Sequence, residues 1–394
     1  MSRTDPSRRA LIAAGAALSL LPGAAFAQAP RAQGRKLVLI ILRGALDGLA
    51  ALAPLGERRY RSLRGGLALT GGAEASDGFV FHPALDHASG LYRRGELLAL
   101  HAAATDYRDR SHFDGQDRLE AGLAVPRDGW LNRALTLMGG AAPGAVAVGR
   151  DLPLVLRGAA PAASWAPAVL PGADDDTIAR LMDLYRDDPS LGPALARALE
   201  TDAAARAMTE DDAAMGGGMR AGARGLEAAR LLGAAAGNLL IAPGGPDLAV
   251  LSLDGWDTHV RQGAETGQLA QRLAGLDAVL SELERRLGPA WAQTAVIVTT
   301  EFGRTVRENG AGGTDHGTGG LALLAGGAVR GGRIIGDWPG LDRLYEDRDL
   351  YPANDLRALF AAVLSDHWGH DRADLARAVF PGADGLGRFS GLIA

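Results

Sequence analysis

Three short polar clusters in the second half of the chain supply carboxylates and, in two of them, imidazoles, and each borders an apolar run. Apolar runs of about six residues that end in glycine or aspartate are typical of buried strands in an α/β sheet. Ligands of such sheets collect beyond the carboxyl ends of the strands, where oxygen and nitrogen side chains can build a metal site. The clusters predict a metal-centred hydrolytic site, or the remains of one. They are Asp254–His259 after Leu248–Leu253, Glu301–Arg304 after Ala295–Thr300, and Asp315–Gly317 ahead of Leu321–Leu324.

Two of these clusters contain histidines with a neighbouring carboxylate. Asp257 and His259 are two residues apart, so in an extended segment both side chains point to the same face and can chelate one ion. His316 lies in a glycine-rich loop, where Asp315 could orient an imidazole ring through a hydrogen bond. The alternative for both clusters is an ordinary surface loop.

Two further carboxylates follow predicted strands. Glu301 comes directly after a strongly apolar run, so it needs a buried partner, which is either a nearby arginine such as Arg304 or a metal ion. Asp47 lies five residues beyond the run Lys36–Leu42, in a turn flanked by glycines. Asp47 is either a metal ligand or the cap of the following helix.

Ser111 precedes a predicted helix and has two alternative roles. As a simple N-cap, it would form an imperfect capping box with Asp114. As a nucleophile, it would profit from the free N–H groups and the positive dipole end of the helix, which stabilise an alkoxide and a bound phosphate. His112 and Arg304 are candidates for contacts to an oxyanion.

The first 27 residues form a separate signal. A twin-arginine pattern lies in Ser7–Ile12, a short apolar stretch runs from Ala10 to Leu21, and Ala25–Ala27 supplies a small-x-small cleavage pattern. The apolar stretch is shorter than the ~20 residues that a membrane span needs, which disfavours an anchor. Residues 1–27 therefore predict a signal peptide read by the twin-arginine export machinery, a mature chain that begins near Gln28, and a periplasmic or secreted location.

Composition limits the classes of partner that the mature chain is expected to bind. Of 41 basic and 46 acidic residues, residues 1–27 hold three arginines and one aspartate, so the remainder carries a formal charge of −7. An acidic chain without a basic cluster disfavours nucleic acid and anionic membranes as main partners. No later segment is long and apolar enough to span a membrane. The absence of cysteine excludes disulfides and thiolate metal sites.

The distribution of apolar residues indicates one α/β domain over residues 28–394. A helical insertion is expected at about 176–240, and the stretch 141–176, rich in alanine, proline and glycine, reads as a long loop. The remaining expected strands are Leu97–Ala102 and, as short strands, Val146–Val148 and Leu152–Leu156. The expected helices are Ser111–Ala121, Gln268–Leu287 and Asp355–Leu364.

As a set, these motifs resemble a known family. The order of strand and Asp, capping Ser, Asp/His pair, strand and acid, and late His is similar to that of the alkaline-phosphatase-like (sulfatase-like) superfamily. More closely, the chain resembles the exported domain-of-unknown-function family fifteen-oh-one. The motifs that carry this resemblance are Leu42–Gly48, Ser111–Phe113, Gly255–His259, Thr300–Arg304 and Asp315–Gly317.

The resemblance implies a mostly parallel central sheet with helices on both faces. It also implies one metal site at Asp257, His259 and His316, and another at Asp47, Ser111 and Glu301, where Phe302 replaces the expected histidine. The bound ion would be divalent: zinc, manganese, calcium or magnesium. The implied function is metal-dependent hydrolysis of a small anionic ester, phosphate or sulfate, with Ser111 or a metal-bound water as the nucleophile. The alternative is a non-catalytic exported binding or assembly protein that keeps a degenerate site.

Overall fold

The computed structural model describes residues 34–125, 127–139, 144–149, 151–166 and 221–394, together with scattered positions between 181 and 199. In this part of the chain the strands are β1 (Lys36–Arg43), β2 (Leu52–Ala53), β3 (Ala73–Glu74), β4 (Val80–Phe81), β5 (Leu97–Ala104), β6 (Ala145–Val148), β7 (Ala163–Trp165), β8 (Leu248–Asp254), β9 (Thr294–Thr300), β10 (Gly320–Ala325), β11 (Arg333–Ile335) and β12 (Asn354–Asp355). The α-helices are α2 (Gly48–Ala51), α3 (Tyr60–Arg64), α4 (Asp86–Arg93), α5 (His112–Ala121), α6 (Trp130–Met138), α9 (Ala221–Ile241), α10 (Gln268–Leu287), α11 (Leu356–Trp368) and α12 (Arg372–Asp374).

Nine of the strands form one sheet, in the order β11-β5-β10-β9-β1-β8-β6-β7, with β12 paired to β5. All neighbouring strands run parallel except β10, which is antiparallel to both β5 and β9. The expected mostly parallel sheet is therefore confirmed. A second, small antiparallel sheet, β2-β4-β3, was not expected from the sequence.

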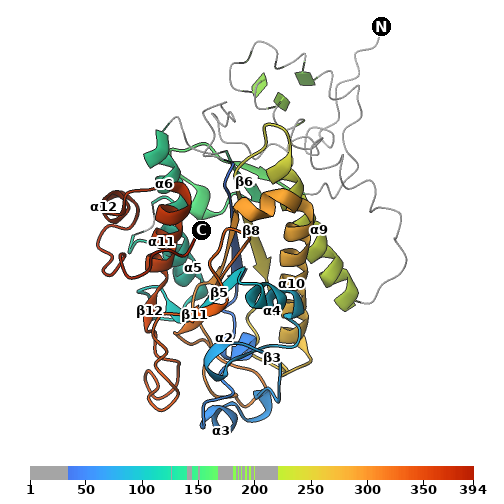
Figure 1. The fold of residues 1–394 in the computed structure, drawn as a ribbon, viewed down its shortest axis with the longest axis vertical. Helices are drawn as coiled ribbons and strands as arrows, with labels where there is room; N and C mark the ends of the chain where they lie inside the picture. Colours follow the sequence, from blue (N-terminus) through green and yellow to red (C-terminus); the bar gives the residue numbers. More distant parts are fainter. Residues whose placement is uncertain are drawn as a thin grey trace, which may run out of the picture.

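Helices cover both faces of the large sheet (Figure 1). Alternate residues of β1 show why both faces must be buried: Leu37, Leu39 and Ile41 pack into one core with residues of α6 and α11. The intervening Val38, Ile40 and Leu42 pack into a second core with residues of α4, α9 and α10. A strand that is apolar on both faces is typical of a sheet covered by helices on each side.

Most of the expected elements are present, with small shifts at their ends. The apolar runs at β1, β5, β6, β8, β9 and β10 are strands, and α5, α10 and α11 are helices. The expected strand over Leu152–Leu156 is wrong, because Leu154–Leu156 is a turn of 3-10 helix. The stretch 141–176 is not simply a loop, because β7 pairs in parallel with β6 inside it.

Two expectations from the sequence fall largely outside the described residues. These are the signal peptide, residues 1–27, and most of the part of the expected helical insertion (about 176–240) that precedes residue 221. The last part of the predicted insertion forms α9, which lies beside α10 (Figure 1). Among the described residues, no helix combines the length and the apolar character needed to cross a bilayer.

The direction of β10 explains how distant segments meet. Because β1, β8 and β9 are parallel neighbours, the residues after each of them emerge at the same edge of the sheet. Because β10 runs the other way, the loop that precedes it also lies at this edge. The polar clusters after β8 and β9 and before β10 are thereby brought together.

Candidate metal centre

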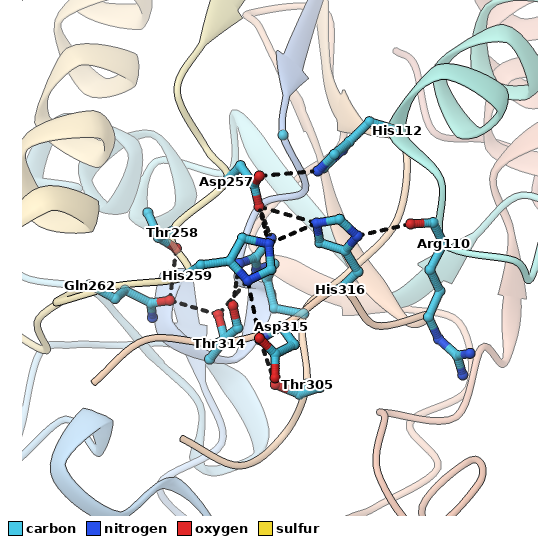
Figure 2. Close-up of polar contacts among 12 residues, drawn as sticks. Arg110, His112, Asp257, Thr258, His259, Gln262, Thr305, Thr314, Asp315 and His316 are labelled. Atoms are coloured by element: carbon cyan, nitrogen blue, oxygen red, sulfur yellow. Dashed lines mark hydrogen bonds and ion pairs between the residues drawn. The ribbon is translucent and has the colours of Figure 1, made fainter. Parts of the chain in front are cut away.

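Four side chains from three segments converge at this edge of the sheet (Figure 2). His259 Nε2 lies 2.9 Å from His316 Nε2 and 2.9 Å from Asp257 Oδ1. Asp257 Oδ1 lies 3.3 Å from His316 Nε2, and Asp257 Oδ2 lies 3.4 Å from His112 Nε2. We refer to His112, Asp257, His259 and His316 as the histidine cluster.

In each histidine of the cluster, Nδ1 contacts a carboxylate or carbonyl oxygen, which can accept a hydrogen bond but cannot donate one. The Nδ1 therefore carries the hydrogen, and the lone pair of Nε2 is left for another partner. Metal-binding histidines in proteins are commonly oriented in this way. The three donor–acceptor pairs are His112 Nδ1 to Glu301 Oε1 (2.9 Å), His259 Nδ1 to Asp315 Oδ1 (3.0 Å), and His316 Nδ1 to the Arg110 carbonyl (2.9 Å).

The spacing of the cluster fits a shared cation. Ligand atoms about 2.0–2.2 Å from one tetrahedral ion are separated by roughly 3.3–3.6 Å. The contacts of Asp257 with His316 and His112, at 3.3 and 3.4 Å, fall in that range, whereas the two contacts of His259 are shorter at 2.9 Å. His112, Asp257 and His316 offer ligand atoms that all lie within 4.8 Å of one another. Among the described residues, the buried Nε2 of His112 has no hydrogen-bond partner. Two unprotonated Nε2 atoms in contact repel each other unless a proton or a cation lies between them.

Asp257 is kept anionic by Arg304. Arg304 NH1 donates to Asp257 Oδ1 over 2.5 Å. Partial burial opposes ionisation of Asp257, but the hydrogen bond and the charge of Arg304 outweigh it and lower the pKa. The buried guanidinium of Arg304 also donates to the hydroxyl and carbonyl of Thr314, and its expected contact with a substrate oxyanion stays a prediction.

Glu301, for which the sequence predicts either a metal ion or a nearby arginine as partner, is bonded in the structure to a histidine of the cluster. Its fully buried carboxylate accepts hydrogen bonds from His112 Nδ1, from Gln116 Nε2 at 3.2 Å and from the Gly44 amide at 2.8 Å. Burial opposes the ionisation of Glu301, but these hydrogen bonds prevail and lower its pKa. The hydrogen bond to Glu301 in turn raises the pKa of His112.

Gly44 has to be glycine for this arrangement. Its φ is +116°, and a Cβ there would lie 2.5 Å from the Asp257 amide nitrogen. The segment after β1 can therefore pass directly behind Asp257 while its amide donates to Glu301.

Asp47, the other predicted carboxylate ligand, lies in a separate buried network. Its Oδ1 accepts from the Ala50 amide at 3.3 Å and so caps α2, which is one of its two expected alternatives. Its Oδ2 accepts from Arg64, which is fully buried, and from Gln262 Nε2 at 2.7 Å. These donors hold Asp47 away from the histidine cluster, and its expected role as a ligand of a second ion, with Ser111 and Glu301, stays a prediction.

Ser111 stands at the N-cap position of α5, between Arg110 and His112. Its side chain makes no capping hydrogen bond to the helix. The expected capping box is also absent: the Ser111 amide donates to the Tyr107 hydroxyl at 3.1 Å, and that hydroxyl donates to Asp114 at 3.3 Å. A purely capping role for the Ser111 side chain is therefore not what the structure shows.

Phe302 forms an apolar wall behind two of the histidines. Its ring stacks on His112 with centroids 5.1 Å apart and lies 5.4 Å from the ring of His316. A Cβ on Gly115 would approach the Phe302 ring to 3.0 Å, so the missing side chain at Gly115 makes room for it. Phe302 thus fixes the imidazoles by packing and supplies no ligand.

Sequence reasoning placed His112 at a substrate oxyanion and did not foresee its place in the cluster. The signal was present, since a histidine at the start of a helix that follows β5 must lie near the same edge of the sheet. The supporting residues leave no comparable local pattern, because their partners are more than 180 residues away in the chain, except for Arg64, whose partner Asp47 is 17 residues away. Those residues are Arg64, Arg110, Gln116, Gln262 and Asp349.

The fold and the cluster together define an α/β protein with a cluster of histidines and a carboxylate, a candidate metal site, at the carboxyl edge of its sheet. The chain belongs to the family described as protein of unknown function (DUF1501), whose profile matches residues 96–374. That span holds the whole histidine cluster, and it confirms the family that the motifs indicated. Among curated proteins, no significant match to the chain was found.

Several solved structures are distantly similar to the chain. The PsFucS1 sulfatase from Pseudoalteromonas sp. is 13% identical, with a TM-score of 0.41 over 99% of this chain and 76% of the sulfatase. The C-terminal periplasmic domain of EcEptC from Escherichia coli, in complex with Zn, is 9% identical, with a TM-score of 0.33 over 74% of this chain and 73% of that domain. The lipoteichoic acid synthase LtaP from Listeria monocytogenes is 9% identical, with a TM-score of 0.31 over 95% of this chain and 79% of the synthase. All three TM-scores lie below 0.5, so the chemistry of the site rests on the residues of the chain itself.

Proposed function

We propose that this chain is an exported, metal-dependent hydrolase of phosphate or sulfate esters, centred on one divalent ion in the histidine cluster. The observation that carries the proposal is the shared orientation of three imidazoles. Each Nδ1 is committed to an oxygen acceptor, while each Nε2 faces the carboxylate of Asp257 or another Nε2.

The ligand set narrows the choice of ion. Three imidazole nitrogens and one carboxylate suit zinc or manganese, whereas calcium and magnesium prefer oxygen ligands throughout. An ion held here would polarise an ester oxygen and lower the pKa of a coordinated hydroxyl or water. The degree of exposure supports a catalytic site, because 40% of the Asp257 side chain and 38% of the His259 side chain remain accessible.

The surrounding residues have separate roles in this proposal. Arg304 holds Asp257 in its anionic form, and Glu301 fixes the ring of His112. Ser111 is the proposed nucleophile, since its hydroxyl lies at the N-terminus of α5, where free N–H groups favour an alkoxide and a bound oxyanion. The formal charge of −7 expected for the mature chain disfavours nucleic acids as substrates, so a small anionic ester is the proposed substrate class.

A non-catalytic binding or assembly protein is the second candidate, and one observation favours it. The two carboxylates expected to bind a second ion are both occupied, Asp47 by Arg64 and Gln262, and Glu301 by His112. A centre with one ion can therefore serve a structural or binding role without catalysis.

Hydrolysis assays separate the two candidates. Protein from the exported fraction is assayed with aryl phosphate mono- and diesters and an aryl sulfate, with zinc or manganese added. The proposal predicts turnover that is lost in His316→Ala and in Ser111→Ala while the fold survives. His87→Ala is the matched control, because His87 pairs with Glu284 on α10 and stands outside the cluster. Metal binding without turnover of any ester class would leave the binding role as the answer.

Export is tested on the same preparation. Amino-terminal sequencing is expected to find Gln28 as the first residue of the exported protein, and replacement of Arg8 and Arg9 by lysine is expected to stop its export. An exported protein that still begins at Met1 would contradict this part of the proposal.

A further inference from the structure

His316 is held at two points by arginines from different parts of the chain. Its Nδ1 donates to the carbonyl of Arg110 over 2.9 Å, as Figure 2 shows. Its own carbonyl accepts a hydrogen bond from the guanidinium of Arg348. The ring and the backbone of this histidine are therefore both fixed from outside its glycine-rich loop.

Both arginines are bound by the same carboxylate. Asp349 Oδ2 accepts from Arg110 Nε over 2.9 Å, and Asp349 Oδ1 accepts from Arg348 Nε over 2.9 Å. The side chain of Asp349 is fully buried, and its backbone forms reciprocal hydrogen bonds of 2.9 and 3.0 Å with Tyr345. A buried carboxylate that binds two guanidinium groups, on a backbone closed by its own pair of hydrogen bonds, is a rigid anchor for both arginines.

The backbone at Arg110 indicates that this anchor does more than hold the fold together. Arg110 has a φ of +62°, a region that residues other than glycine rarely occupy. Its carbonyl holds His316 in this conformation while its side chain is bound to Asp349. Backbone strain of this kind persists where the surroundings over-determine it, and it concentrates at functional sites.

We propose that Asp349 is the positioning residue for His316: through Arg110 and Arg348 it fixes the direction in which His316 Nε2 faces the histidine cluster. The proposal rests on the metal centre argued above, but it concerns the ring of His316 and can be tested with and without metal. Asp349 touches neither the proposed ion nor a substrate.

The first test measures metal affinity in Asp349→Asn, which keeps the size of the side chain and removes its charge. Zinc affinity is expected to fall about 10- to 100-fold, the usual effect of losing an outer partner of a metal ligand. With cobalt as a spectroscopic probe, the visible absorption bands are expected to change shape, because the geometry at His316 changes. Arg348→Gln, which removes only one of the two contacts to His316, is expected to show a smaller loss.

Asp247→Asn is the matched control. Asp247 is likewise buried and ion-paired, in its case with Lys36 at the start of β1, on the opposite edge of the sheet from the cluster. This variant is expected to lose stability while keeping the zinc affinity and the cobalt spectrum of the wild type. Unchanged affinity and spectrum in Asp349→Asn, or an equal loss in Asp247→Asn, would overturn the proposal.

The second test uses metal-free protein, so it remains decisive even if the wild type binds no metal. In protein labelled with ¹⁵N-histidine, the Nδ1–H signal of His316 is assigned with His316→Gln. This proton is expected to exchange slowly in the wild type and at least about tenfold faster in Asp349→Asn, because the Arg110 carbonyl is no longer held. Equal exchange in the two proteins would refute the positioning role, whereas failure of the metal centre alone would leave this difference intact.

Discussion

Glu301 holds His112 from a fully buried position, with Glu301 Oε1 2.9 Å from His112 Nδ1, and leaves His112 Nε2 directed at Asp257. In the structure Glu301, a carboxylate that the sequence predicts as a metal ligand, orients the ring of His112, which can itself serve as a ligand. The same relation recurs between Asp315 and His259 at 3.0 Å. In both pairs the carboxylate accepts from Nδ1 and Nε2 faces the histidine cluster. Two pairs with this shared orientation are difficult to explain by packing alone.

Replacing Glu301 by glutamine tests this relation. Glutamine keeps an oxygen for His112 Nδ1 but removes the charge that raises the pKa of His112, so that pKa is expected to fall toward its usual value of 6.5. Histidine NMR of the metal-free protein measures it. Zinc affinity is expected to fall by about tenfold for glutamine and by up to about 100-fold for alanine. An unchanged pKa and affinity in both variants would show that Glu301 does not act through His112.

Removing the Asp47–Arg64 pair is expected to affect stability rather than metal binding. Asp47→Ala leaves the fully buried Arg64 without its carboxylate, which costs about 3–5 kcal/mol of the free energy of unfolding. Urea unfolding measures this loss. Elemental analysis of the folded variant is expected to show the metal content of the wild type. Loss of the ion in Asp47→Ala would instead show that Asp47 is a ligand, one of the two roles that the sequence allows.

Acidification is expected to destabilise the protein through two buried histidines outside the cluster. Burial lowers the pKa of His101 and of His367 from 6.5 to about 4. Because the folded-state pKa is the lower one, the stability that these groups contribute is complete above pH 6.5 and is lost as the pH falls toward 4. The loss at pH 5 is roughly 2 kcal/mol per histidine.

Urea unfolding at pH 7 and at pH 5 checks this prediction. In His367→Gln, the difference in unfolding free energy between the two pH values is expected to shrink by the roughly 2 kcal/mol that one histidine contributes. A difference that stays the same in this variant would show that His367 does not titrate as its burial requires.

Metal removal is expected to lower the melting temperature. An ion that binds only the folded chain stabilises it by about 2.7 kcal/mol at a free concentration 100-fold above its Kd. Calorimetry with a chelator and with added zinc measures the shift. The shift is expected to disappear in His259→Ala and to persist in His87→Ala. A chelator effect of equal size in both variants would place the ion elsewhere.

The sequence predicts the sheet well because β1, β8 and β9 are apolar on both faces, which leaves them few alternatives in a folded chain. It also predicts that Asp257, His259 and His316 belong together. It does not reveal that β10 runs against its neighbours, although this direction brings His316 to the carboxyl edge. Strand direction depends on long-range packing rather than on local pattern.

The partners of three site residues could not be predicted, for one physical reason. Residue type and position after a strand place Asp47, Glu301 and Arg304 at the edge of the sheet but do not indicate the nearest partner. In the structure each of them has a partner outside its own local motif: Asp47 is paired with Arg64, Glu301 accepts from His112, and Arg304 is paired with Asp257. Buried charges must be paired, but sequence alone does not identify the partner.

The metal content of protein purified from the exported fraction tests the central claim most directly. Elemental analysis of the wild type is expected to find about one zinc or manganese ion per chain, and less than about a tenth of that in His259→Ala and His316→Ala, as expected when a ligand is lost. His87→Ala is expected to match the wild type. A wild-type protein that is free of metal, binds none when zinc or manganese is added, and melts at the same temperature with and without a chelator would contradict the account.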